Sequence, residues 1–226
     1  MHAPRVLVLI PAMNEEEGIR QTIEEAGKKL SYLSLLVVDG NSIDRTVQVA
    51  KDLGADVFCQ TGRGKGAAIA EGLLHVPDDF DYVVLTDADF TYPIEYANEM
   101  MEILDVNPSV GMVLGNRFNG NLNLGKLHDV LYFGNRFIAI THNLLNGVQL
   151  RDPLTGLRVV RGKLLKGWHP KSAGFDIEVE LNHYIERLGY DIWEVPIHYR
   201  DRVGEKKLRF RDGFSILNRI MAEAIR

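Results

Sequence analysis

Two aspartates at the end of one apolar run are the residues of this sequence best suited to chemistry. Asp87 and Asp89 come after the apolar run 82–84, which predicts a buried strand over residues 82–86. Side chains alternate between the faces of a strand, so the two carboxylates point the same way. Two negative charges held close together are unfavourable without a nearby cation, and hard oxygen ligands suit Mg²⁺ or Mn²⁺. The pattern predicts a divalent metal site, although a capped turn at a strand end also fits it.

Two further polar segments follow predicted strands. Asp39 ends the apolar run 35–38, where its carboxylate can accept hydrogen bonds from a base or a ribose. Residues 62–66, Gly-Arg-Gly-Lys-Gly, open a predicted helix, and free N–H groups at a helix start favour an anion. No Ser or Thr follows Lys65, so this is not a Walker motif. The segment is either an anion-binding loop or a flexible basic turn.

A strongly basic run occupies residues 202–209, although the chain as a whole carries a formal net charge of −5. Such a run is typical of a solvated surface. Alternatively it is a mobile clamp that, together with Arg117 and Arg136, supplies charge-assisted hydrogen bonds to a phosphate. The histidines show no spacing typical of metal ligands.

The elements that must position these residues alternate along the chain. Short apolar runs predict strands at residues 6–10, 35–38, 56–59, 82–86, 112–114, 157–160 and 192–199. Helical periodicity predicts helices at residues 15–30, 45–53, 65–74, 94–104, 127–148, 175–188 and 214–225. This alternation predicts an α/β fold with a mostly parallel central sheet flanked by helices. Ligands bind at the carboxyl ends of strands in such sheets, where segments 11–17, 39–45 and 87–91 are expected to converge.

Length and composition restrict the class of protein. The chain has 226 residues, of which 46% are hydrophobic and 25% charged, which is ordinary for a globular domain. We expect one domain over residues 1–226, elaborated from about residue 200 to 226 by a basic loop and an amphipathic helix. The acidic balance argues against nucleic acid as a partner. The single cysteine, Cys59, excludes an internal disulfide and is expected to be a buried, inert thiol in a core strand.

The sequence also bears on location. The run 6–12 lacks the length and flanks of a signal peptide, and no stretch approaches the roughly 20 apolar residues that span a bilayer. We expect a cytoplasmic protein, peripheral at the cytoplasmic face of a membrane. Helices 127–148 and 214–225 have apolar stripes that either pack on the core or dock on a membrane.

Taken in series, the motifs resemble those of inverting glycosyltransferases of family 2, which have the GT-A fold. The motifs that carry the resemblance lie at residues 8–16, 38–46, 64–66 and 86–89. Later motifs resemble the dolichyl-phosphate mannose synthase branch, at residues 152–158, 174–178, 194–200 and 202–208. The resemblance covers nearly the whole chain.

The resemblance implies transfer of a hexose from a nucleotide-sugar, with GDP-mannose favoured, to a polyprenyl or dolichyl phosphate. A UDP-sugar such as UDP-glucose is the alternative donor, because Gly40 stands where the family often has a second Asp. Relatives often carry C-terminal membrane helices, so a membrane surface or a membrane-anchoring partner subunit is an expected partner. The site residues that the motifs imply are Pro11, Asn14, Glu15 and Asp39 for the nucleoside, Lys65 near the donor, Asp87 and Asp89 for Mg²⁺ or Mn²⁺, and Arg117, Arg136, Arg202 and Lys207 for the lipid phosphate.

The implied chemistry accounts for these residue types. A phosphomonoester has a second pKa of about 6, so it is largely ionised near neutrality and attacks without a general base. The metal stabilises the departing diphosphate, and the basic residues hold two anions together. Asp89, Asp152 and Arg202 are the predicted catalytic residues, although Asp152 precedes a proline and is equally suited to forming a loop.

Two alternatives stay open at this point. A sugar nucleotidyltransferase has a similar nucleotide-binding layer, but it places a glycine-rich loop after the first strand, where this chain has residues 11–15, Pro-Ala-Met-Asn-Glu. A non-catalytic nucleotide-sugar-binding subunit would keep the same fold. Against it stands the joint presence of Asp87, Asp89, Arg117, Arg202 and Lys207.

Overall fold

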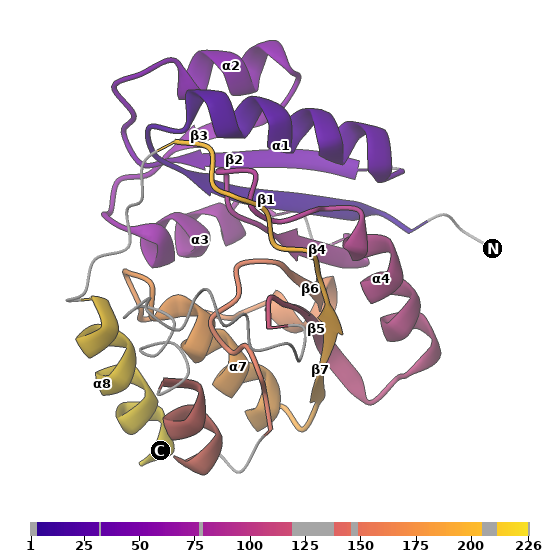
Figure 1. The fold of residues 1–226 in the computed structure, drawn as a ribbon, viewed down its shortest axis with the longest axis vertical. Coiled ribbons are helices and arrows are strands. Elements are labelled where there is room, and N and C mark those ends of the chain that lie inside the picture. The colour runs from indigo at the N-terminus through magenta and orange to yellow at the C-terminus, as the bar shows by residue number, and fades with distance from the viewer. Residues whose placement is uncertain are drawn as a thin grey trace.

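A seven-stranded sheet forms the centre of the computed structural model, which describes residues 4–31, 33–76, 79–118, 138–145, 149–204 and 212–225 (Figure 1). The strands are β1 (Val6–Ala12), β2 (Leu33–Asp39), β3 (Asp56–Cys59), β4 (Tyr82–Leu85), β5 (Val110–Asn116), β6 (Arg158–Arg161) and β7 (Asp191–Pro196). The helices with labels are α1 (Glu16–Lys29), α2 (Thr46–Asp52), α3 (Lys65–Leu73), α4 (Tyr96–Val106), α6 (Gly162–Leu165), α7 (Ile177–Arg187) and α8 (Asp212–Ala224). Residues 138–145 form a further helix.

The sheet is mostly parallel, as expected. Its strand order is β3-β2-β1-β4-β6-β5-β7. Strand β1 pairs in parallel with β2 and β4, β2 pairs in parallel with β3, and β5 pairs in parallel with β7. Among the described strands, β6 alone runs in the opposite direction, and it pairs antiparallel with both β4 and β5. The carboxyl ends of β1, β2 and β4 therefore lie at one edge of the sheet.

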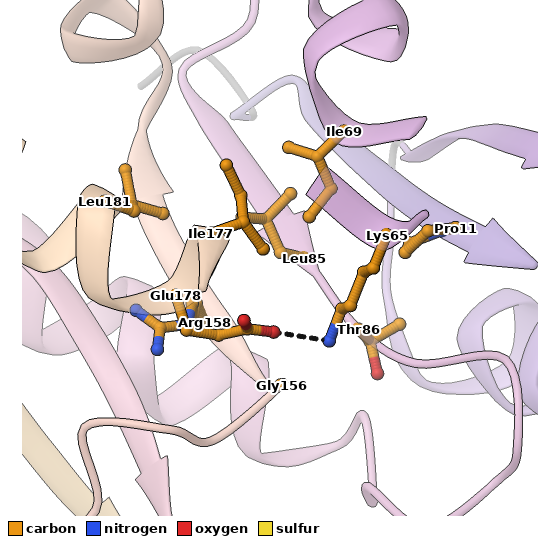
Figure 2. A pocket seen from close by; sticks show the side chains of 10 residues that line it. All are labelled: Pro11, Lys65, Ile69, Leu85, Thr86, Gly156, Arg158, Ile177, Glu178 and Leu181. Atoms are coloured by element: carbon orange, nitrogen blue, oxygen red, sulfur yellow. Dashed lines mark ion pairs between the residues drawn. The ribbon is translucent and has the colours of Figure 1, made fainter. Parts of the chain in front are cut away.

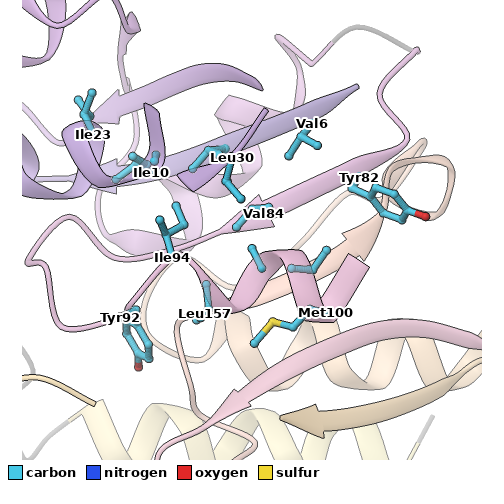
Figure 3. Packing of buried hydrophobic residues seen from close by; sticks show 14 of the residues in the cluster. Val6, Ile10, Ile23, Leu30, Tyr82, Val84, Tyr92, Ile94, Met100 and Leu157 are labelled. Carbon is cyan, nitrogen blue, oxygen red and sulfur yellow. The ribbon is translucent and has the colours of Figure 1, made fainter. Parts of the chain in front are cut away.

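Alternation along β1 explains why its sequence is a continuous apolar run. Val6, Val8 and Ile10 face a core cluster that includes residues of α1, α2 and α4, part of which is drawn in Figure 3. Leu7 and Leu9 face a second cluster, with residues of α3 and α7. A strand buried on both faces needs apolar side chains at every position, so helices on both sides hold β1 in place.

A third, smaller core joins the C-terminal helix to the body of the protein. Ile216 and Ile220 of α8 pack with Val179 of α7 and Ile138 of the helix at residues 138–145. Helix α8 lies beside that helix at the lower left of Figure 1. The helix predicted at 127–148 is observed over residues 138–145, and its other residues lie outside those described. The extent of the domain, residues 1–226, stays a prediction.

Two expectations about local structure are wrong. Cys59 is exposed, not buried, because β3 lies at the edge of the sheet and pairs with β2 alone among the described strands. The last strand ends at Pro196, not at residue 199. The Ile197 N–H still donates to the carbonyl oxygen of Asn116 (2.9 Å), the last residue of β5, so the pairing stops where the partner strand ends. Residues 197–204 instead cross the carboxyl edge of the sheet, where the Val203 N–H donates to the Asp89 carbonyl oxygen (3.2 Å).

The packing of β1 gives a stability prediction. Leu9 is fully buried in the second cluster, so Leu9→Ala should lower the free energy of unfolding by about 2–5 kcal/mol. Leu74→Ala is the matched control, because the Leu74 side chain is 72% exposed and should cost less than about 0.5 kcal/mol. Urea unfolding followed by circular dichroism measures both. Equal midpoints for the two variants would contradict the burial of Leu9.

Candidate active site

The loops at the carboxyl edge of the sheet contain an unusual backbone conformation. Among the residues that the structure describes, three non-glycine residues have positive φ, at 50° for Asn14, 64° for Asn41 and 62° for Phe90. They follow β1, β2 and β4, the strands whose carboxyl ends lie together. Such conformations are uncommon outside glycine and cost energy, and they gather at functional sites. Their concentration here indicates that these loops are shaped for binding.

The two aspartates of the opening motif are electrostatic neighbours. The Asp89 carboxylate accepts a hydrogen bond from the Thr91 hydroxyl (2.6 Å) and pairs with the Arg202 guanidinium (Nη1–Oδ2, 2.5 Å). Burial, followed by the nearby charge of Asp87, raises the pKa of Asp89. Asp87 pairs with the Lys65 ammonium (2.5 Å). Each carboxylate therefore has a cation from a distant part of the chain beside it.

Lys65 is the first residue of α3, and its ammonium bridges two carboxylates. Its Nζ lies 2.5 Å from Asp87 Oδ1 and 2.6 Å from Glu178 Oε1, and Figure 2 shows Lys65 and Glu178 facing each other across a narrow pocket. Burial acts to lower the pKa of Lys65, but the two carboxylates raise it overall. The ammonium stays charged and is held tightly.

The glycines on either side of Lys65 allow close packing. Gly64 has a φ of 94°, which favours glycine. A Cβ on Gly66 would collide with the carbonyl oxygen of Ser172. The Ala67 N–H donates to the Ala173 carbonyl oxygen (3.2 Å). The segment 62–66 is therefore a turn packed against residues 172–173, and its glycines bring Lys65 to Glu178.

Arg202 connects three parts of the site. Its guanidinium pairs with Glu15, which follows β1, and with Asp89, which follows β4. The Glu15 N–H in turn donates to the Thr46 hydroxyl at the start of α2 (2.7 Å). Sequence reasoning assigned Glu15 and Arg202 to different ligands, and the structure brings them together.

Two of the residues assigned to the nucleoside, Asp39 and Asn14, are joined by hydrogen bonds through Ser42. The Ser42 hydroxyl donates to Asp39 Oδ1 (2.5 Å), and the Ser42 N–H donates to Asp39 Oδ2 (2.9 Å). The same hydroxyl accepts from the Asn14 N–H (2.8 Å), while Asn14 Oδ1 accepts from the Ile43 N–H (2.8 Å). Pro11 lies in β1 and lines the pocket of Figure 2. The Asp39 carboxylate thus shapes the loop after β2.

Arg117 and Asp152 form a buried pair. Asp152 is 1% exposed, and it accepts from the Arg117 Nε and Nη2 (2.7 Å each) and from the Arg117 N–H (3.0 Å). The guanidinium carbon lies 5.5 Å from the centre of the Tyr199 ring. Burial acts to lower the pKa of Arg117, and Asp152 raises it overall. The remaining candidates, Arg136 and Lys207, lie outside the described residues.

Sequence reasoning missed two charged residues of the site. Glu178 stands in a quoted motif, but nothing local showed that it meets Lys65. Arg158 is fully buried in β6, and it donates to the carbonyl oxygens of Thr155 (2.9 Å) and Pro153 (2.7 Å). Arg158 thereby fixes the loop that carries Asp152. The sequence signal that could have pointed to Arg158 was a charged residue directly before two valines of a predicted strand.

The donor set fits a divalent cation that brings further ligands with it. Among the residues that the structure describes, no group of three or more His, Cys, Asp or Glu is placed to hold a metal. Asp87 and Asp89 supply two carboxylates, and Mg²⁺ or Mn²⁺ commonly takes its other ligands from phosphates and water. Gly156 leaves room for the Asp87 carboxylate itself, because a Cβ there would lie 2.7 Å from Asp87 Oδ2.

Comparison with known proteins identifies the family. Residues 7–167 match the sequence model of glycosyl transferase family 2. The chain belongs to this family. It is 32% identical over 204 residues to a dolichyl-phosphate hexose transferase of Haloferax volcanii, covering 89% of this chain and 85% of that one. It is also 32% identical over 200 residues to glycosyltransferase AglJ of the same organism, covering 87% of this chain and 63% of AglJ.

Solved structures agree on the fold. Glucosyl-3-phosphoglycerate synthase from Mycobacterium tuberculosis, in complex with Mn²⁺, UDP-glucose and phosphoglyceric acid, superposes with a TM-score of 0.77 at 22% identity. The alignment covers 98% of this chain and 80% of the synthase. The GT-A-like fold, the family resemblance and the activity class of a glycosyltransferase are confirmed.

In the described part of the chain, no helix is both long and apolar enough to cross a bilayer.

The tight approach at Gly66 gives a second stability prediction. Gly66→Ala puts a methyl group against the Ser172 carbonyl oxygen, so it should lower the free energy of unfolding by about 1–3 kcal/mol. Gly27→Ala is the control, because a Cβ there meets nothing within 4 Å and alanine in a helix stabilises by roughly 0.5–1 kcal/mol. Urea unfolding should thus shift in opposite directions. A stabilising Gly66→Ala would contradict the packing around Lys65.

Proposed function

We propose that this chain transfers a hexose from a nucleotide-sugar to a polyprenyl phosphate, with a divalent cation held by Asp87 and Asp89. The observation that carries the proposal is the convergence of this acidic pair with two cations, Lys65 and Arg202, at the carboxyl edge of the sheet. The name of the dolichyl-phosphate hexose transferase from Haloferax volcanii supports the acceptor class.

The proposed donor is GDP-mannose, which the resemblance of the motifs favours. UDP-glucose is the second candidate, because the mycobacterial synthase of similar fold was crystallised with that donor. The proposed nucleoside site lies between the loop after β1, which contains Asn14, and the end of β2 with its following loop, which contain Asp39 and Ser42. Hydrogen bonds join these segments, so a nucleoside meets a surface that is already ordered.

The residues at the site have separate tasks in the proposed reaction. The acceptor phosphate is ionised, so its oxygen attacks the anomeric carbon without a general base, opposite the leaving diphosphate. Lys65 and Arg202 provide positive charge for the two phosphate-bearing substrates. A bound Mg²⁺ or Mn²⁺ supplies Lewis-acid stabilisation of the diphosphate. Asp152, held by Arg117, keeps the adjoining loop in place.

The proposed location is the cytoplasmic surface of a membrane, where a polyprenyl phosphate resides. Apolar side chains stand exposed on two neighbouring helices, Ile140 and Leu144 at residues 138–145 and Phe214 and Met221 on α8. The inner sides of both helices pack in the third core. Their exposed sides are suited to lie at the boundary between lipid headgroups and acyl chains. A membrane-anchoring subunit is the alternative means of attachment.

An activity panel tests the reaction. The chain is incubated with GDP- and UDP-sugars and dolichyl phosphate, with and without Mn²⁺, and lipid-linked product is measured by mass spectrometry. Product should require metal, and Asp89→Ala should lower the rate at least about 100-fold. Asp56→Ala is the control, since Asp56 is an exposed aspartate at the start of β3. Undiminished product with Asp89→Ala would refute the metal assignment.

Liposome flotation tests the membrane surface. The chain should float with vesicles that contain dolichyl phosphate and anionic lipid. Leu144 is 81% exposed and Phe214 is 64% exposed. The double variant Leu144→Glu/Phe214→Glu places a charge at each of these positions, and it should not float because charged groups oppose insertion into the membrane. Val106→Glu, at an exposed site on α4, should float normally. Equal flotation of all three proteins would exclude this surface as the membrane contact.

A further inference from the structure

Glu178 holds a charge at the site that none of the tasks above uses. It lies in the first turn of α7, 6% exposed, with Oε1 2.6 Å from Lys65 Nζ. Its other oxygen, Oε2, is buried without a hydrogen-bond partner among the described residues. An unpaired buried carboxylate oxygen is costly, so its retention needs an explanation beyond packing.

The pocket beside Glu178 is too small for this carboxylate to act on a sugar. Pro11, Lys65, Thr86 and Gly156 line it with Glu178, and its volume is ≈ 10 Å³, room for about one water molecule (Figure 2). What Glu178 does contact is the Lys65 ammonium. Its role therefore has to be sought in the charge balance around Lys65.

Two buried cations depend on Glu178. The Lys65 ammonium pairs with Glu178 as well as with Asp87. Arg158 hydrogen-bonds only to neutral acceptors in the described residues, the carbonyl oxygens of Pro153 and Thr155 and the side chain of Asn182, apart from a long contact to the Met112 sulfur. Figure 2 shows the Arg158 guanidinium next to Glu178. Burial lowers the pKa of Arg158, and Glu178 contributes most to offsetting that effect.

A conflict arises at Asp87 if this carboxylate is to bind a divalent cation. The Lys65 ammonium already lies 2.5 Å from Asp87 Oδ1. When Asp87 turns to a metal ion, Lys65 loses one of its two counter-charges while it stays buried. An ammonium left there without any carboxylate would be costly and would repel the arriving cation.

We propose that Glu178 is a positioning residue for the metal site, which retains the Lys65 ammonium and so frees Asp87 for a divalent cation. This inference rests on the proposed function, since it assumes that Asp87 binds metal. Glu178 touches neither the cation nor the sugar in this role. It sets the metal affinity through Lys65.

Direct measurement of Mn²⁺ binding tests the proposal without an activity assay. Free Mn²⁺ is quantified by electron paramagnetic resonance during titration of the chain in the presence of GDP or UDP. Glu178→Gln should weaken Mn²⁺ binding at least about tenfold, because it removes the charge and leaves the shape. Glu186→Gln is the matched control, since Glu186 is also a carboxylate of α7 with a buried oxygen that has no hydrogen-bond partner in the described part of the chain. This variant should change the affinity less than about twofold.

Two further variants separate charge from shape. In a Lys65→Met background the effect of Glu178→Gln should shrink to less than about threefold, because the ammonium it serves is gone. Glu178→Asp keeps the charge and should bind Mn²⁺ within about threefold of the unaltered chain, and it tests the proposal even if Glu178→Gln does not fold. Thermal unfolding shows which variants are folded.

The outcomes distinguish this inference from the proposed function. Failure of the unaltered chain to bind Mn²⁺ with either nucleotide would count against the proposed metal site itself. Binding by the unaltered chain together with equal binding by a folded Glu178→Gln variant would overturn the role of Glu178 alone. A loss as large with Glu178→Asp as with Glu178→Gln, or an undiminished effect in the Lys65→Met background, would overturn it as well.

Discussion

The balance of buried charge at the carboxyl edge of the sheet is the constraint on which the rest of the site depends. Asp87 and Asp89 are near each other in the chain, and Lys65 and Arg202 offset the repulsion between their charges. A buried charge that loses its partner costs several kcal/mol. The segments after β1 and β4 are thus tied to charges from other elements, and any ligand that binds one of these charges must leave the remaining ones paired.

The fold provides the rigidity that this balance requires. Strand β1 is buried on both faces, and it pairs with β2 and β4, whose loops carry the charged residues. The backbone at Asn14, Asn41 and Phe90 adopts positive φ just beyond these strands. Such local strain persists only where the surrounding structure enforces it, so the well-packed sheet maintains the conformation of the loops.

Local patterns predicted most of this architecture, and long-range relations account for what they missed. Helix α3 and strand β3 occupy nearly the predicted residues, because periodicity is a property of the segment itself. The order of strands in a sheet is not a property of any one segment, so the sequence around Cys59 could not show that β3 lies at an edge. Likewise the motif with Glu178 was visible, but its contact with Lys65 depends on how α7 packs against α3.

The cost of leaving a buried charge unpaired also separates the roles of Arg117 and Arg202, the two arginines assigned to the acceptor phosphate that lie within the described residues. A phosphate that takes Arg117 has to replace the two side-chain hydrogen bonds to Asp152 and leave that carboxylate buried with a single N–H donor. Arg202 instead pairs with Asp89 and Glu15 through a separate nitrogen each. If Asp89 turns to a metal ion, the nitrogen that faced it becomes available to an anion while Glu15 keeps the guanidinium in place. The geometry therefore suits Arg117 to holding the loop of Asp152 and Arg202 to meeting a phosphate.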